Sequence, residues 1–187
     1  MRVDSFTRED SNDLGPGWYE SEQAVGRISI YSNQLALGDG GNVGICYRTE
    51  AWAPNQSCSL KFKSRQGGPC GGPAIRMSGV YTACYGYVVY HNASTLYLKK
   101  FVNNNVPTSG GGTDLGDPAS CTIVANDILK IEAIGTTIKV YVNDVEYISV
   151  VDSSITTGKP GGIGNGYYTY WTDFVGLGDI KGLTFSW

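Results

Sequence analysis

The sequence contains no apolar run that could cross a lipid bilayer. A membrane-spanning helix needs about 20 consecutive apolar residues, whereas the most apolar stretches here, such as 84–91 (CYGYVVYH), are short. The sequence also has no cluster of basic residues. Its 14 Lys and Arg are outnumbered by 17 Asp and Glu, which gives a net charge of −3. We therefore expect neither membrane insertion nor binding of nucleic acid, whose phosphates require a concentrated positive field.

Histidine is scarce, and the cysteines cannot all be paired. His91 is the single histidine, and the cysteines are odd in number and lack CxxC spacing. The five are Cys46, Cys58, Cys70, Cys84 and Cys121. This pattern excludes a fully paired disulfide framework and a zinc cluster. We expect free thiols in the interior, with a bridge between Cys70 and Cys84 as the alternative, and a surface position for His91 beside a strand end.

Glycine and tyrosine are abundant instead. The 26 Gly and 13 Tyr, with frequent Thr, Val and Ile, favour strands and tight turns over helices. In 57–64 (SCSLKFKS), Cys58, Leu60 and Phe62 alternate with serine and lysine, the period of two that is typical of a strand with one buried face. Further strands are expected at 24–32, 34–38, 43–49, 74–78, 84–91 and 95–101.

The segment 125–151 is interpreted as an antiparallel meander. Residues 125–135 contain a possible helix cap at Asn126, but apolar and charged residues alternate in 128–133 and again in 137–142. The pair Asn143-Asp144 supplies a turn, because both residue types tolerate positive φ. Three consecutive strands follow from this pattern.

Two segments are expected to be loops. Residues 103–119 carry almost no apolar side chain, and residues 158–166 (GKPGGIGNG) are so rich in glycine that loop conformations are favoured. The second segment leads into 167–171 (YYTYW), the junction where we look for function. No repeat or linker interrupts the strand pattern, so we predict one domain, residues 1–187, with an all-β antiparallel β-sandwich.

Three segments carry motifs of a known family. Residues 4–18 (DSFTREDSNDLGPGW) contain Asp-x-Phe-x-Arg-x-Asp followed by Leu-Gly-x-x-Trp. Residues 126–164 contain a meander that ends in Asp-Ser and Gly-Lys-Pro-Gly, and 171–180 (WTDFVGLGDI) would form a closing strand. Together these segments resemble the concanavalin A-like lectin/glucanase domains, which are related to laminin G-like modules. The resemblance implies a concanavalin A-like jelly roll, a fold that hosts lectins, hydrolases and structural modules alike.

Residues for glycoside hydrolysis are not evident. An enzyme of this fold would carry a Glu-x-Asp-x-x-Glu-like strand, because the two carboxylates must lie about 5 Å apart, and no such motif is present. The nearest acidic pairs, Glu20 with Glu22 and Asp144 with Glu146, are interpreted as solvated surface charges. A GxSxG elbow that could pair with His91 is missing too. We predict no catalytic residue and a non-enzymatic protein.

Aromatic side chains are better candidates for ligand binding. Sugar rings stack on Tyr and Trp while polar neighbours fix their hydroxyl groups. The predicted ligand-binding residues are Arg76, Tyr85, Tyr87, Tyr168, Tyr170 and Trp171. The alternative is that half of these aromatic residues fill the core or a subunit interface, as we expect for Phe6, Trp18 and Phe62.

The resemblance also raises the question of calcium, because jelly-roll lectins often hold a hard cation with carboxylates and carbonyls. Asp4 and Asp173 would approach each other if the first and last strands paired. No dense acidic loop accompanies them, so we predict no cofactor.

The start of the chain bears on location. No apolar segment typical of a secretory signal follows Met1, and an extracellular type of fold without one would be explained by release on lysis. We therefore expect a bacteriophage virion protein, a head decoration or tail appendage, that binds other virion subunits or a host-surface glycan. The alternatives are a secreted carbohydrate-binding module and a glycoside hydrolase or lyase of this fold. A homo-oligomer, such as a trimer, is suggested by symmetry alone.

Overall fold

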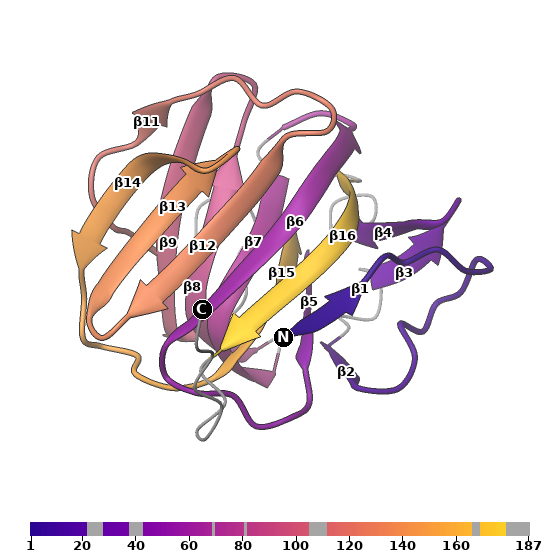
Figure 1. The fold of residues 1–187 in the computed structure, drawn as a ribbon, viewed down its shortest axis with the longest axis horizontal. Coiled ribbons are helices and arrows are strands. Elements are labelled where there is room, and N and C mark those ends of the chain that lie inside the picture. The colour runs from indigo at the N-terminus through magenta and orange to yellow at the C-terminus, as the bar shows by residue number, and fades with distance from the viewer. Residues whose placement is uncertain are drawn as a thin grey trace, which may run out of the picture.

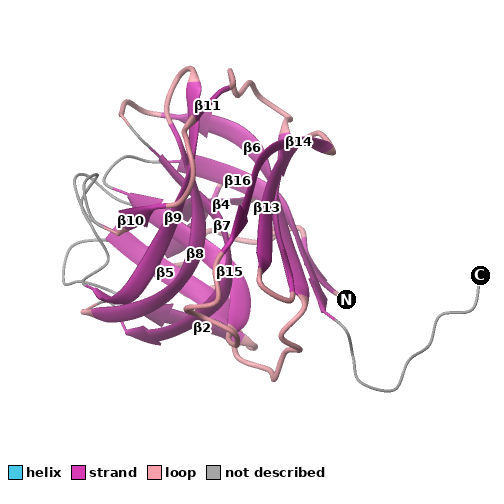
Figure 2. Ribbon diagram, turned by 90° about the vertical axis from the view of Figure 1, so that its left-hand side faces the viewer, coloured by secondary structure: helices cyan, strands magenta, loops and turns pink. Residues whose placement is uncertain are grey.

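A computed structural model describes residues 1–21, 28–37, 43–68, 70–80, 82–104, 112–165 and 169–178. Within these ranges the chain forms strands and turns and no helix, so the described part has no helix that could cross a membrane. The strands form two antiparallel sheets that lie face to face (Figures 1 and 2). The predicted all-β sandwich is confirmed.

The first sheet, in the foreground of Figure 1, runs in the order β14-β13-β12-β6-β16-β4-β3, and β1 pairs with β16. Its strands are β1 (Arg2–Asp4), β3 (Ile28–Tyr31), β4 (Gln34–Leu37), β6 (Gln56–Arg65), β12 (Ile128–Ile134), β13 (Thr137–Val142), β14 (Val145–Val151) and β16 (Thr169–Gly178).

The second sheet runs in the order β10-β9-β8-β7-β15-β5-β2, and β11 pairs with β9. Its strands are β2 (Trp18–Ser21), β5 (Val43–Arg48), β7 (Cys70–Val80), β8 (Ala83–His91), β9 (Thr95–Asn104), β10 (Thr113–Asp114), β11 (Ala119–Ser120) and β15 (Lys159–Asn165).

The main core fills the space between the sheets. In β6, Cys58, Leu60 and Phe62 are at most 4% exposed, as their alternation with polar residues predicted. Phe6 and Trp18 join the same core, which confirms their assignment. All five cysteines are free and buried, as expected.

The meander is also confirmed. Strands β12, β13 and β14 pair consecutively, and the turn before β14 places Asn143 at φ 50° and Asp144 at φ 63°. Positive φ at two consecutive central residues is the geometry that matches the right-handed twist of a hairpin.

The expected loop at 158–166 is wrong over most of its length. Residues 159–165 form β15, which lies between β5 and β7 near the centre of the second sheet. Its glycines permit close contact with these neighbours, because a Cβ added at Gly161 would lie 2.0 Å from the carbonyl oxygen of Cys46. Glycine in a strand interior often marks such an approach of another backbone.

The expected loop at 103–119 is interrupted as well. Strand β9 continues to Asn104, and β10 and the start of β11 pair with β9. Leu115 packs against the main core and its N–H donates to the carbonyl of Leu98. Residues 105–111 lie outside the described residues, as do 24–27 of the first expected strand.

Candidate ligand-binding surface

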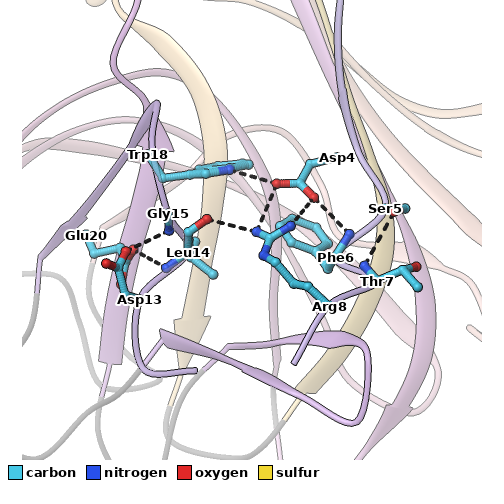
Figure 3. Close-up of polar contacts among 10 residues, drawn as sticks. All are labelled: Asp4, Ser5, Phe6, Thr7, Arg8, Asp13, Leu14, Gly15, Trp18 and Glu20. Carbon is cyan, nitrogen blue, oxygen red and sulfur yellow. Dashed lines mark hydrogen bonds and ion pairs between the residues drawn. The ribbon is translucent and has the colours of Figure 1, made fainter. Parts of the chain in front are cut away.

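The N-terminal motif forms a polar cluster around Asp4 (Figure 3). The Asp4 carboxylate accepts hydrogen bonds from the Phe6 N–H at 2.8 Å, from Arg8 at 2.7 and 3.1 Å, and from the Trp18 indole at 3.0 Å. Burial alone would raise the pKa of Asp4, but the bonds from Arg8, Phe6 and Trp18 outweigh it and lower the pKa. Arg8 also donates to the Leu14 carbonyl. The cluster therefore fastens the N-terminal segment to the sandwich.

These residues do not fit a bound calcium ion. Strands β1 and β16 pair, as the calcium hypothesis required, but the Asp4 oxygens already face Arg8 and an indole N–H. Asp173 is 3.1 Å from the Lys61 ammonium. Among the residues that the structure describes, no three His, Cys, Asp or Glu side chains form a metal-binding group.

The outer faces of the two sheets differ. On the first sheet, Lys61, Lys130 and Lys139 project outward, and each pairs with a carboxylate. Two of those carboxylates belong to Asp144 and Glu146, which agrees with their interpretation as surface charges.

The second sheet carries an apolar outer face. In β8, Tyr87 and Val89 belong to the main core, so the alternating Val88 and Tyr90 project from the opposite face. These two residues belong to a second cluster, which we call the outer apolar layer. It comprises Ile45, Tyr47, Ala74, Met77, Cys84, Val88, Tyr90, Phe101 and Ile163. Its members are at most 8% exposed.

A pair of tyrosines lies at the border of this layer. Trp18 points into the main core, so its neighbour Tyr19 projects outward from β2. Tyr19 pairs in register with Tyr47 of β5, and the rings stack with centroids 4.5 Å apart and planes 22° from parallel. Tyr19 is half-buried and Tyr47 is 8% exposed. We refer to these two residues as the tyrosine pair.

The surroundings of the tyrosine pair hold it in one arrangement. The Tyr47 hydroxyl donates to the carbonyl of Gly79 at 3.0 Å, and burial raises the pKa of Tyr47 to about 12. Tyr47 therefore stays a neutral phenol at physiological pH. The ammonium of Lys159, at the start of β15, lies 5.4 Å from the centre of the Tyr47 ring, within reach of a cation–π attraction.

Another aromatic pair lies farther along the outer face. Tyr90 of β8 pairs in register with Tyr97 of β9. The Tyr90 hydroxyl is buried without a hydrogen-bond partner, whereas the Tyr97 hydroxyl accepts from the Asn92 amide at 3.3 Å. Tyr97 is half-buried against the outer apolar layer, so a second partly exposed tyrosine lies on the other side of this layer, on β9.

The predicted residue Arg76 lies in the interior and is 1% exposed. Its φ is 53°, and its guanidinium donates to the carbonyls of Pro54, Gly135 and Ile155 at 2.7 to 3.1 Å. Its backbone N–H donates to the Gln56 side chain. Arg76 thus supplies donors to connecting segments, and a ligand cannot contact it in this conformation.

Tyr87 and Trp171 also face the interior. Tyr87 donates to Asp152 at 2.6 Å and accepts from the Ile155 N–H, and burial raises its pKa to about 12. Trp171 is 0% exposed and packs edge-on against Phe62. Both side chains match the alternative in which predicted aromatics fill the core.

The remaining predicted residues are not gathered on one surface. Tyr85 is half-buried against the main core, on the face it shares with Tyr87. Tyr170 is half-buried on the first sheet, and its ring centre is 6.1 Å from that of Tyr31. Tyr168 lies outside the described residues. Sequence reasoning missed the tyrosine pair, although the alternation in 18–21 (WYES) indicates that Tyr19 points away from the core residue Trp18.

The surface position expected for His91 is wrong. The side chain is 0% exposed and packs edge-on against Phe62 and Trp171. Neither ring nitrogen has a hydrogen-bond partner. Burial, together with the charge of Arg65, lowers the pKa of His91 to about 4. His91 is therefore a neutral core residue at pH 7.

A hollow of about 620 Å³ lies at the end of the sandwich near His91. It is lined by Arg65, Gly67, Gly68, Asn92, Ala93 and Ser94. None of these lining residues is aromatic, so the hollow offers no ring on which a sugar could stack. The tyrosine pair is therefore the better candidate for a ligand-binding site.

Comparison with known proteins identifies the fold. No protein-family model matches the sequence, and no curated protein matches it either. Among solved structures, the chain is similar to the carbohydrate-binding module CBM66 from Bacillus subtilis, with 17% identity, 86% of this chain and 94% of that chain covered, and a TM-score of 0.69.

Two further structures have the same architecture. The exoplasmic/lumenal domain of VIP36, in a form bound to Ca²⁺ and Man3GlcNAc, shares 13% identity over 98% of this chain and 93% of that chain, with a TM-score of 0.61. A Bacillus subtilis protein of unknown function with a galectin-like fold shares 11% identity over 95% of both chains, with a TM-score of 0.61. The chain therefore has the β-sandwich fold of the concanavalin A-like lectins.

Proposed function

We propose that this protein is a non-catalytic glycan-binding module and that the tyrosine pair is part of its binding surface. The observation that carries the proposal is a half-buried Tyr19 ring stacked on Tyr47 at the border of an apolar outer face. A sugar presents an apolar face of C–H groups, and aromatic side chains offer a large apolar surface with a polar end.

The stacked arrangement suits this role because little conformational entropy remains to be lost. Tyr47 is held by its hydrogen bond to Gly79 and by the ring of Tyr19. A side chain that is ordered before binding loses fewer rotamers when a ligand arrives. The tyrosine pair therefore offers a preformed platform.

The similar structures support a role in binding. One is called a carbohydrate-binding module, and another was solved with Man3GlcNAc bound. Lectins and enzymes share many folds, so the sandwich by itself does not decide between them, and the proposal rests on the tyrosine pair.

The test begins with a glycan array, which identifies glycans that the unmodified protein binds. The affinity of Tyr19→Ala for these glycans is then measured by isothermal titration calorimetry. We expect affinity to fall on the order of tenfold or more, because the stacking surface is removed. Tyr19→Phe should keep most of the affinity. The matched control is Tyr31→Ala, which removes a 55% exposed tyrosine from the first sheet and should leave affinity unchanged.

Thermal unfolding of each variant separates loss of the site from loss of the fold. Equal glycan affinity of Tyr19→Ala and the unmodified protein would refute the role of the tyrosine pair. Turnover of β-glucan or alginate that one carboxylate substitution abolishes would refute the non-catalytic assignment.

For its location we propose a virion, where other virion subunits or a host-surface glycan would be the partners, and a secreted module is the alternative. The tyrosine pair would serve a binding role in either place. Sedimentation of the protein with intact phage particles would support the virion. Its absence from particles, together with saturable glycan binding, would favour secretion.

A further inference from the structure

We infer that the glycan bound at the tyrosine pair is anionic and that Lys159 recognises its negative group. This inference rests on the proposed function, since it names the chemical class of the ligand at the same surface. Lys159 begins β15, and its ammonium lies 5.4 Å from the centre of the Tyr47 ring.

No described carboxylate forms an ion pair with Lys159. Among the described lysines, five form ion pairs with carboxylates, and Lys63 donates to the amide oxygen of Asn126. The five paired lysines are Lys61, Lys99, Lys100, Lys130 and Lys139. For Lys159, the interaction found within the described ranges is the cation–π contact with the ring of Tyr47. Its positive charge is therefore left for a ligand.

Two described carboxylates near the tyrosine pair, those of Glu20 and Glu50, are turned away or already paired. Glu20 follows Tyr19 on β2, so it projects to the opposite face, where it accepts a hydrogen bond from the Leu14 N–H. Glu50, just beyond β5, is bound by Arg2 and Arg48. Among the described residues, the ammonium of Lys159 is therefore the charged group beside the tyrosine pair that has no carboxylate partner, although the whole chain carries a net charge of −3.

The two tyrosines and Lys159 lie in a row across the second sheet. Tyr19, Tyr47 and Lys159 come from the adjacent strands β2, β5 and β15. The ring centres are 4.5 Å apart and the ammonium is 5.4 Å from the second ring. Because β5 lies between β2 and β15, a glycan chain that stacks on Tyr19 would extend across Tyr47 to place an anionic substituent near Lys159. A charge-assisted hydrogen bond to carboxylate or sulfate would then add to the stacking.

The net negative charge makes this inference specific. A strongly basic protein binds any polyanion through its overall field, whereas a net charge of −3 repels polyanions at long range. Binding of an acidic glycan would thus report a local positive site.

The experiment compares three probes: polygalacturonate, dextran sulfate and neutral mannan. We expect the unmodified protein to prefer polygalacturonate or dextran sulfate over mannan, and Lys159→Met to weaken binding of the preferred probe about five- to tenfold. Lys159→Arg should restore most of the affinity. Lys63→Met, which removes a lysine from the first sheet, is the matched control and should have no effect.

The two acidic probes distinguish the source of the charge, since preference for polygalacturonate indicates a carboxylate and preference for dextran sulfate a sulfate ester. Raising the salt concentration should weaken the unmodified protein more than Lys159→Met. If mannan binds best and Lys159→Met binds it normally, the anionic ligand is refuted while the proposed glycan binding stands. If no glycan binds, both are refuted.

Discussion

The outer faces of the two sheets obey different rules, although both sheets are antiparallel and share one core. On the first sheet, three lysines pair with carboxylates, as in Lys139 with Glu146 at 2.8 Å. On the second sheet, the same kind of position holds residues such as Val88 and Ile163, which are 0% exposed. An antiparallel sheet with one face on the core and the other in water alternates apolar and polar residues. The second sheet departs from this pattern, because its outer face is apolar as well.

This difference indicates that the two sheets have different roles. The first sheet provides a solvent-exposed surface with ion pairs. Such exposed pairs contribute little to the free energy of unfolding, roughly 0 to 1 kcal/mol each. The second sheet has apolar residues on both faces, so it can present an aromatic border such as the tyrosine pair from a rigid base. Sites on rigid elements hold their side chains more reproducibly than sites on loops.

The largest expected difference in stability is between a carboxylate placed on the outer face of the second sheet and one placed on the outer face of the first. Val88→Asp should destabilise the protein by about 4 kcal/mol or more, because it buries a carboxylate without a partner in the outer apolar layer. Ser149→Asp, on an exposed position of the first sheet opposite Lys139, should change stability by about 0.5 kcal/mol or less. Urea unfolding of both variants measures the contrast.

If Val88→Asp does not fold, Val88→Thr gives a milder version of the same test, with an expected loss of about 1 to 2 kcal/mol. Equal tolerance of both faces to a carboxylate would show that the outer apolar layer is not buried in solution.

The second prediction concerns acid. The unfolded chain should protonate His91 near its ordinary pKa of 6.5, whereas the folded protein does so only near 4. Between these values the unfolded state binds more protons, so stability is lost as pH falls through this window, by about 3 kcal/mol in total. His91→Leu should remove this loss, as measured by urea unfolding at pH 7 and pH 4.5. A stability profile of His91→Leu that still declines like that of the unmodified protein would exclude His91 as the cause.

The smallest effect is expected on the first sheet. In the folded protein, the hydrogen bond and charge of Glu146 raise the pKa of Lys139. Glu146→Gln removes this charged partner. Both side chains are more than a third exposed, so solvent and salt screen the pair. We expect no measurable change in the free energy of unfolding. A clear loss of stability in urea unfolding would show that this exposed ion pair does contribute to folding.

Local alternation made much of the fold predictable. The strands around Leu60 and the meander of 128–151 follow from apolar residues at every second position, and the turn at Asn143-Asp144 follows from residue types that tolerate positive φ. The glycine-rich strand β15 was missed, because its conformation depends on β5 and β7 on either side. Glycine has no side chain whose preference could reveal such a strand.

The candidate site was less predictable than the fold. Tyr85 and Tyr87 do share one face, as the alternation indicated, but that face is the inner one. Arg76 lies at an irregularity of β7 between Ile75 and Ser78, where its φ of 53° directs it to carbonyls of distant connections. Neither fact can be derived from β7 or β8 in isolation, since both depend on what packs against the strands.

The sequence by itself determined that the chain is built of strands, because the period of its apolar residues is a local property of consecutive positions. The tertiary structure alone decided which face of each strand meets water, where His91 and Arg76 are buried, and that Tyr19, Tyr47 and Lys159 come together from three strands. The physical reason is that burial and juxtaposition arise from pairing between segments far apart in the chain, and no single segment carries that information.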